Sequence, residues 1–434
     1  MTEYSGLNGH VFYRRMNHAH PMVSHGQGIY LFDTDGKRYI DASGGPVLVN
    51  VGHGIPEIVE AMTTQAKVAA YVHATMFTSQ AVEDYSAALA EVTPLDNPRF
   101  FCLSSGSEAV ETAIKFARQV QVDRGEGQRY QIISRWQSYH GTTLGALAVS
   151  GRPGLRRLYQ PMMVQMPHIE PPYCYRCPYE LAYPDCELKC ARDIERAVEF
   201  ENPELITAFI GEPIMQGFGV VPPPKEYWPI VREICNKYGI LLIIDEVICG
   251  FGRTGKMFGV EHFGINPDML TMAKGISSGY VPLGAVGCTD KVMEPIENFF
   301  HLHTYGNHPV ACAAALKNIE IMQTEKLINN SEKMGQYFLQ CLKNLEQHAI
   351  VGEARGRGLW LALDLTVDKK THAPFPTDRI ANMIRRAKHL GVIIKAMGCA
   401  LEFAPPLIVT KEEIDEALKV IEQCITEEEK NMRM

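Results

Sequence analysis

Two side chains in this 434-residue sequence place an amine and an acid where they could act together. Asp245 directly follows the apolar run Ile240–Ile244, and Lys274 follows a second run, Met269–Ala273, with Gly275 after it. Short continuous apolar runs are typical of strands buried on both faces of a parallel sheet, and the carboxyl ends of such strands face the crevice where α/β sheets bind ligands. The two residues, 29 positions apart, are therefore expected at one ligand site.

This pair fits the chemistry of pyridoxal phosphate (PLP), whose aldehyde forms a Schiff base with a lysine and whose protonated ring acts as an electron sink. A carboxylate about 4 Å from the ring nitrogen contributes roughly 4 kcal/mol at an effective dielectric near 20, before desolvation. Lys274 must lose its proton to attack, which a partly desolvated site beside other cations favours. Taken singly, a lysine before a glycine is more often a solvated loop residue, and an aspartate after a strand more often caps a helix.

Other apolar runs predict the elements that would position this pair. Strands are predicted at 100–103, 131–134 and 207–211. A β-hairpin is predicted over Gly28–Asp41, because Asp35-Gly36 is a strong turn signal. At 434 residues the chain exceeds the usual size of a single core, so two packed domains are expected.

The segment DEVICGFGRTGKMF, followed by PDMLTMAKGISSGYVPLGAV, resembles the signature of the class III aminotransferases, a branch of the fold-type I PLP enzymes. The resemblance implies an α/β fold with a large PLP-binding domain at 61–309, whose mostly parallel central sheet is flanked by helices. It implies a small α+β domain built from both chain ends, 1–60 and 310–434. It also implies that Lys274 is catalytic and carries PLP as a Schiff base while an amino group passes from an amine or amino acid to a keto acid, pyruvate or 2-oxoglutarate.

The turn Ser104–Ser107 lies between a predicted strand and a helix that begins near Glu108. The backbone N–H groups of Gly106 and Ser107 would point at an anion from the positive end of that helix, although Ser-Gly-Ser before a helix is more often a plain N-cap turn. The segment SSGSEAVETAIKFAR resembles the family here, which implies that Ser105, Gly106 and Ser107 bind the cofactor phosphate.

The same resemblance implies further cofactor-binding residues. Tyr139, in the triplet YHG, would stack on the cofactor ring, and His140 would support this loop. Glu212 would lie near the substrate, and Val247 would lie close to the cofactor two residues after the aspartate. Thr304 would bind the cofactor phosphate of the other subunit, which implies a homodimer with shared active sites, or a tetramer.

The predicted substrate pocket departs from the family pattern. Family members grip the α-carboxylate with an arginine, and the matching position here is Glu402; others use a mobile arginine slightly earlier, where this chain has Lys395. We take Lys395 and Glu402 as substrate-binding residues. If Glu402 and Glu212 approach each other, the pKa of one rises unless a cation such as Lys395 neutralises the pair.

Three functions follow from these residues. If Lys395, or an arginine such as Arg357, holds a keto acid, the protein is an aminotransferase. If the carboxylate is poorly held, a PLP-dependent amino-acid or amino-lactam racemase is the alternative, because the LEF-PPL context of Glu402 is similar to that of an acidic residue in the class III racemase of α-amino-ε-caprolactam. The third function is a cofactor-free relative used for assembly or regulation, against which the set Lys274, Asp245 and Ser105–Ser107 argues.

Composition excludes several classes of partner. The net charge of −8 argues against binding to nucleic acid or to an anionic membrane. The sequence has no apolar run near the roughly 18 residues that span a bilayer, and its first residues, MTEYSGLNGHVFYRR, lack the apolar core of a signal peptide. We therefore expect a cytoplasmic enzyme whose partners are a small amino donor and a keto-acid acceptor.

Two further motifs invite other interpretations. Four of the twelve cysteines, Cys174-x2-Cys177 and Cys186-x3-Cys190, have the count and spacing of a tetrathiolate zinc or iron–sulfur site, although the tyrosines and prolines around them can pack such a loop without a metal. We expect no metal in catalysis. The segment 250–255, GFGRTG, matches G-x-G-x-x-G, but a dinucleotide site needs this motif at a strand-to-helix turn.

Overall fold

The computed structural model describes residues 9–433. The strands of its largest sheet are β4 (Arg99–Leu103), β5 (Gln131–Arg135), β6 (His168–Ile169), β7 (Ile206–Gly211), β8 (Leu241–Asp245), β9 (Met269–Ala273) and β10 (Gly284–Cys288). Their order across the sheet is β4-β10-β9-β8-β7-β5-β6. Neighbours from β9 to β6 are parallel, whereas β10 is antiparallel to both β9 and β4. The carboxyl ends of the five parallel strands therefore share one edge.

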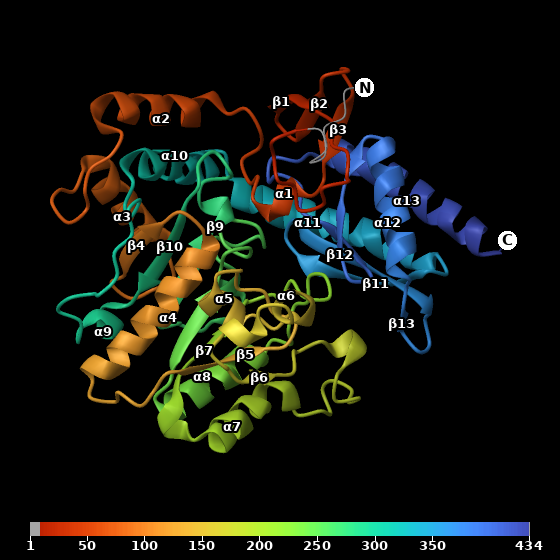
Figure 1. Cartoon of the computed structure of the whole chain (residues 1–434). Helices are drawn as coiled ribbons and strands as arrows, with labels where there is room; N and C mark the ends of the chain where they lie inside the picture. The colour runs from red at the N-terminus through yellow and green to blue at the C-terminus, as the bar shows by residue number, and fades with distance from the viewer. Residues whose placement is uncertain (1–8, 434) are drawn as a thin grey trace.

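Both faces of this sheet are buried, which explains the continuous apolar runs in its strands. Leu241 and Ile243 of β8 pack in one core cluster with α4 (Gly106–Asp123). The alternate residues, Leu242 and Ile244, belong to a second cluster that includes residues of α8 (Tyr227–Tyr238). Figure 1 shows α4 and α8 on opposite sides of the sheet. This layered arrangement confirms the predicted α/β class.

The two ends of the chain meet in a second lobe (Figure 1). Strands β1 (Val23–Gln27), β2 (Tyr30–Asp33) and β3 (Arg38–Asp41) form a sheet with β14 (Val392–Ile393), and β3 pairs with β14 in parallel. Another sheet has the order β11-β12-β16-β15, with β13 beside β12. Its strands are β11 (Val351–Arg357), β12 (Trp360–Asp368), β13 (Ala373–Pro374), β15 (Lys395–Met397) and β16 (Ala400–Phe403).

The remaining α-helices are distributed over both lobes. They are α1 (Gly44–Val47), α2 (Pro56–Ala69), α3 (Gln80–Val92), α5 (Leu144–Val149), α6 (Pro153–Arg156), α7 (Lys189–Glu201), α9 (Asp290–Met293), α10 (Pro309–Thr324), α11 (Leu327–Asn344), α12 (Thr377–His389) and α13 (Lys411–Arg433). None of the helices between residues 9 and 433 combines the length and apolar character that a bilayer crossing requires. The division into segments 1–60, 61–309 and 310–434 stays a prediction, and residues 1–8 of the first segment lie outside the described residues.

The G-x-G-x-x-G segment forms tight turns that hold the two lobes together. Residues 250–254 are turns, residue 255 is a bend, and a 3-10 helix (Gly259–Phe263) follows. Arg253 of this segment is completely buried. It donates hydrogen bonds to the carbonyl of Leu359, at 3.1 Å, and to Oδ1 of Asn50, at 2.7 Å. Through these bonds, the segment 250–255 contributes to the packing of the fold.

Candidate active site

The acid and the amine singled out in the sequence lie at the ends of neighbouring strands. β8 and β9 pair in parallel, with Asp245 opposite Thr271, three residues before Lys274. Asp245 is the last residue of β8 and is 3% exposed. Lys274 follows β9 directly and has a φ of 54°, in the left-handed region that residues other than glycine rarely adopt. Such backbone outliers cluster at functional sites.

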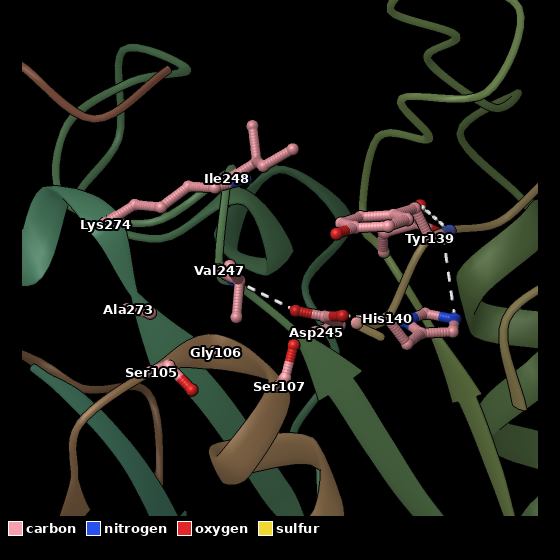
Figure 2. A pocket seen from close by; sticks show the side chains of 12 residues that line it. Ser105, Gly106, Ser107, Tyr139, His140, Asp245, Val247, Ile248, Ala273 and Lys274 are labelled. Atoms are coloured by element: carbon pink, nitrogen blue, oxygen red, sulfur yellow. Dashed lines mark hydrogen bonds and ion pairs between the residues drawn. The ribbon is translucent and has the colours of Figure 1, made fainter. Parts of the chain in front are cut away.

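These residues open onto one cavity, which has a volume of about 550 Å³ including its open mouth. Figure 2 shows Lys274 and Tyr139 projecting from different sides, with Asp245 and the start of α4 between them. The residues that line it are Ser105, Gly106, Ser107, Tyr139, His140, Gly141, Glu212, Asp245, Val247, Ile248, Ala273 and Lys274. All predicted cofactor-binding residues except Thr304 are in this set.

The carboxylate of Asp245 is bonded through both of its oxygens. Oδ2 lies 2.6 Å from Nδ1 of His140, and since a carboxylate only accepts, Nδ1 carries the hydrogen. Oδ1 accepts the backbone N–H of Val247 at 3.1 Å. These bonds fix the orientation of the carboxylate at the bottom of the cavity.

Glu212, which follows β7, is held in the same way. Its Oε1 accepts the backbone N–H of Tyr139 at 3.1 Å, and its Oε2 accepts Nη2 of Arg135 at 3.0 Å. Arg135 is completely buried and also donates to the backbone carbonyl of Glu212, at 2.7 Å. The buried carboxylate of Glu212 therefore has its own cation, and it positions the backbone of the loop that carries Tyr139.

The first turn of α4 forms the end of the cavity below Lys274 (Figure 2). Ser105 is the N-cap, and its hydroxyl accepts the backbone N–H of Glu108 at 3.2 Å. The N–H groups of Gly106 and Ser107, in the first helical turn, have no acceptor within the helix. Such N–H groups can hold an anion, and binding of the cofactor phosphate by Ser105, Gly106 and Ser107 stays a prediction.

The pKa of Lys274 is lowered to about 8, mainly by burial and next by the positive charge of Lys395. The carboxylates of Asp245 and Glu402 act in the opposite direction, and Arg152 adds a smaller lowering effect. At neutral to weakly alkaline pH, an appreciable share of Lys274 is then the free amine. This is the form that attacks a carbonyl carbon or accepts a proton.

The predicted substrate residues Lys395 and Glu402 lie next to each other on β15 and β16 but do not line this cavity. Glu402 is completely buried. Its Oε1 accepts Nε1 of Trp360 at 2.7 Å and lies 3.6 Å from Nζ of Lys395. Glu212 and Glu402 therefore do not share one cation, because Arg135 pairs with the first and Lys395 with the second.

Two other predicted residues lie outside the cavity. Thr304 is exposed in the turn before α10, and a role toward a second subunit stays a prediction. Arg357, named as a candidate for the keto acid, is the last residue of β11 and is exposed. It is not among the residues around Lys274.

The four clustered cysteines line a second, smaller cavity together. Burial raises the pKa of Cys174 to about 11 and that of Cys190 to about 12, and the neighbouring thiols add to both effects. Among residues 9–433, however, no group of three or more His, Cys, Asp or Glu side chains is arranged to hold a metal ion. The structure brings the predicted ligands together without giving them a ligating geometry.

Sequence reasoning missed two arginines of the site. Arg135 closes the strand β5, so a charge at the end of an apolar run, the signal that pointed to Asp245, could have found it. Arg152 follows α5 in a loop without periodicity, and its guanidinium carbon lies 4.8 Å from the centroid of the Tyr139 ring. No sequence pattern distinguishes Arg152 from the exposed Arg157 nearby.

Comparisons with known proteins agree with this geometry. The family model for class III aminotransferases matches residues 12–425. Over 410 residues the chain is 39% identical to the uncharacterized aminotransferase YhxA of Bacillus subtilis (strain 168), covering 92% of this chain and 90% of that protein. It is 36% identical to the putrescine–pyruvate aminotransferase of Pseudomonas aeruginosa, covering 93% and 90%.

A solved structure of a thermostable (S)-enantioselective omega-transaminase from Thermomicrobium roseum superposes with a TM-score of 0.90 at 38% identity, covering 95% of this chain and 94% of that one. This likeness confirms the predicted fold. Because the family model and the relatives cover nearly the whole chain, the predicted enzyme class is confirmed as well. The chain belongs to the class III aminotransferase family.

Proposed function

We propose that this aminotransferase carries PLP on Lys274 and transfers an amino group from a primary-amine donor to pyruvate, with 2-oxoglutarate as the alternative acceptor. The observation that supports this most is the convergence of Lys274, Asp245 and the start of α4 on one cavity. The relative named putrescine–pyruvate aminotransferase supports the choice of an amine donor and of pyruvate.

The residues of the cavity fit PLP by shape and charge. The N–H groups of Gly106 and Ser107 would hold the phosphate, Asp245 the ring nitrogen, and Tyr139 and Val247 the ring. A Cβ atom at Gly106 would lie only 3.0 Å from Cγ1 of Val247. A side chain at position 106 would therefore require Val247 to shift. When bound, PLP supplies an electron sink for the pair left on the donor carbon.

Lys274 has two tasks in this proposal. Its free amine, favoured by the pKa of about 8, binds the cofactor covalently and is released when the donor amine takes its place. The released Nζ would then remove the proton from the donor carbon as a general base and return it to a carbon of the cofactor. Asp245, fixed by His140 and Val247, keeps its carboxylate in one orientation at the bottom of the cavity.

We propose a homodimer with shared sites, or a tetramer, from the apolar surface around Thr304. Met76 is 74% exposed, Phe300 88% and Leu302 76%. The segments that carry them meet at His308, which contacts the rings of both Tyr71 and Tyr305. Large exposed apolar side chains gathered beside a ligand site are typical of a subunit contact.

The cellular location and the domain division are part of the same proposal. We place the enzyme in the cytoplasm, and we assign 61–309 to the cofactor domain and both chain ends to the small one. The parallel pairing of β3 with β14, which joins residues near the two ends of the chain, supports that division.

Transfer and racemisation are separated by the need for an acceptor. The purified holoenzyme is incubated with single-enantiomer alanine or with putrescine, with and without a keto acid, and products are resolved by chiral chromatography. We expect amino transfer only when the keto acid is present. Loss of optical purity without any keto acid would instead support the racemase, which the transaminase relatives do not favour. Absence of both reactions and of cofactor absorbance would support the cofactor-free relative.

A further inference from the structure

A keto acid brings a carboxylate to this site, and four cationic side chains besides Lys274 are candidates to bind it. They are Arg135, Arg152, Arg253 and Lys395. Among these, the charges of Lys395 and Arg152 are the ones that lower the pKa of Lys274. Arg152 also lies beside the cavity, because its guanidinium carbon is 4.8 Å from the centroid of the Tyr139 ring, which lines it.

Two of the four have no exposed surface. Arg135 is completely buried against Glu212, and Arg253 is completely buried in its bonds to Asn50 and Leu359. Withdrawing either guanidinium from these acceptors would leave buried oxygens without donors, which is unfavourable. Neither is available to a ligand.

Lys395 is committed to a buried acid. Its Nζ lies 3.6 Å from Oε1 of Glu402, whose side chain has no exposed surface. If Lys395 turned toward a substrate, the buried charge of Glu402 would lose its cation, and such charges are strongly destabilising when unpaired. Lys395 is thus committed to Glu402 before any substrate arrives.

Arg152 is fixed in place by hydrogen bonds but keeps donors that are not bonded within residues 9–433. Its guanidinium lies over the ring of Tyr139, with Nη2 donating to Oε1 of Gln216 at 3.0 Å and Nε to the carbonyl of Gln137 at 3.4 Å. Within residues 9–433 no hydrogen bond is made by its Nη1, and the side chain is partly exposed. A planar guanidinium fixed at one edge and free at the other is well suited to a carboxylate.

Gln216 links Arg152 to the buried Glu402, and the charge of Arg152 is not neutralised by this link. Its Nε2 donates to Oε1 of Glu402 at 3.5 Å, while its Oε1 accepts from Arg152. Glu402 therefore orients Gln216, and Gln216 orients the guanidinium. The carboxylates of Glu212 and Glu402 also act on Arg152 and raise its pKa against the lowering effect of burial.

We propose that Arg152 binds the carboxylate of the keto-acid acceptor at the edge of the Tyr139 ring, with Gln216 as its positioning residue. This inference rests on the proposed transamination and names the group that recognises its acceptor. It accounts for acceptor binding in a chain whose family arginine positions hold Glu402 and Lys395.

The test separates the two half-reactions of the holoenzyme, followed by cofactor absorbance. Propan-2-amine, a donor without a carboxylate, drives the first half, and pyruvate drives the second. Arg152→Gln removes one charge-assisted interaction, so the KM for pyruvate should rise about 10- to 100-fold while the half-reaction with propan-2-amine changes less than about threefold. Arg152→Lys keeps the charge but loses the planar fork, and should fall between the two.

A binding measurement without turnover accompanies the kinetics. Calorimetric titration of the holoenzyme with oxamate, an unreactive analogue of pyruvate, should show the same loss of affinity in Arg152→Gln. The matched control is Arg157→Gln, which removes an exposed arginine five positions away and should leave both measurements unchanged. If Arg152→Gln does not fold, Gln216→Met supplies the test, because it frees the guanidinium and should weaken oxamate binding.

Two results would overturn the inference. An equal loss in both half-reactions would mean that Arg152 only supports the ring of Tyr139, and an unchanged affinity for oxamate would mean that the carboxylate binds elsewhere. Failure of the proposed function looks different, because the wild-type protein would then show neither cofactor absorbance nor a half-reaction with propan-2-amine.

Discussion

Buried carboxylates lie at two places in this molecule, the carboxyl edge of the large sheet and the strand pair β15–β16 of the smaller sheet. The oxygens of these carboxylates are hydrogen-bonded differently at the two places. At the sheet edge, both oxygens of Asp245 and both of Glu212 accept a hydrogen bond. On β16, Oε1 of Glu402 has partners, whereas its buried Oε2 has none among the described residues.

This difference separates two tasks. A carboxylate bonded through both oxygens keeps one orientation, which suits a group that acts on the same cofactor atom in every turnover. A carboxylate with an unsatisfied oxygen beside Lys395, Gln216 and Arg152 belongs to a network that can rearrange or accept another donor. We infer that the sheet edge carries the reaction and that the region around Glu402 sets the choice of substrate.

The largest expected effect on activity comes from Lys274, the reacting amine at the sheet edge. Lys274→Ala removes the covalent attachment and the general base together, so kcat/KM should fall by at least about 10⁴-fold. Steady-state kinetics with pyruvate as acceptor measures this. Lys395→Ala is the matched control from the other region, and it should retain cofactor binding. Equal losses in the two variants would remove the distinction between the regions.

Asp245→Asn should have the next largest effect. A carboxylate about 4 Å from a ring nitrogen contributes roughly 4 kcal/mol at an effective dielectric near 20, which corresponds to about a 10³-fold loss of rate when the charge is removed. Single-turnover kinetics with the donor alone measures it. Asp268→Asn is the control, because Asp268 bonds Arg232 and the backbone of Leu242 near the start of β9 and should affect stability alone.

A stability experiment examines the region around Glu402. Lys395→Met leaves the buried Glu402 carboxylate without its cation and should lower the free energy of unfolding by about 1–3 kcal/mol. The double variant Lys395→Met/Glu402→Gln no longer has that charge and should melt above the single variant in a thermal scan of the holoenzyme. If the double variant melts at or below the single one, the pair is not the source of the effect.

The smallest expected effect is a shift in the pKa of Lys274 at the sheet edge, caused by a change in the charges around Glu402. Only the neutral amine of Lys274 attacks the cofactor, so the rate at which apoprotein is reconstituted with PLP should rise with pH and level off above a pKa of about 8. The charge of Lys395 lowers this pKa and that of Glu402 raises it, so the midpoint should move upward in Lys395→Met. A midpoint that stays in place or moves downward would show that the two regions are electrically independent.

The residues at the sheet edge could be predicted from the sequence, whereas the contacts around Glu402 could not. Asp245 and Lys274 end apolar runs that form neighbouring strands, so local patterns were sufficient to find them, and the family resemblance supplied the start of α4. Arg152 and Gln216 meet Glu402 through contacts between loops and strands far apart in the chain. The spacing of apolar residues does not reveal such a group. Its members are far apart in the sequence and come together only when the whole chain folds.

The central claim is tested most directly by locating the cofactor on the chain. The active holoenzyme is reduced with borohydride, digested, and its peptides are analysed by mass spectrometry. We expect the pyridoxyl group on Lys274 alone, with Lys395 unmodified. A pyridoxyl group on another lysine, or none on fully active protein, would contradict the account.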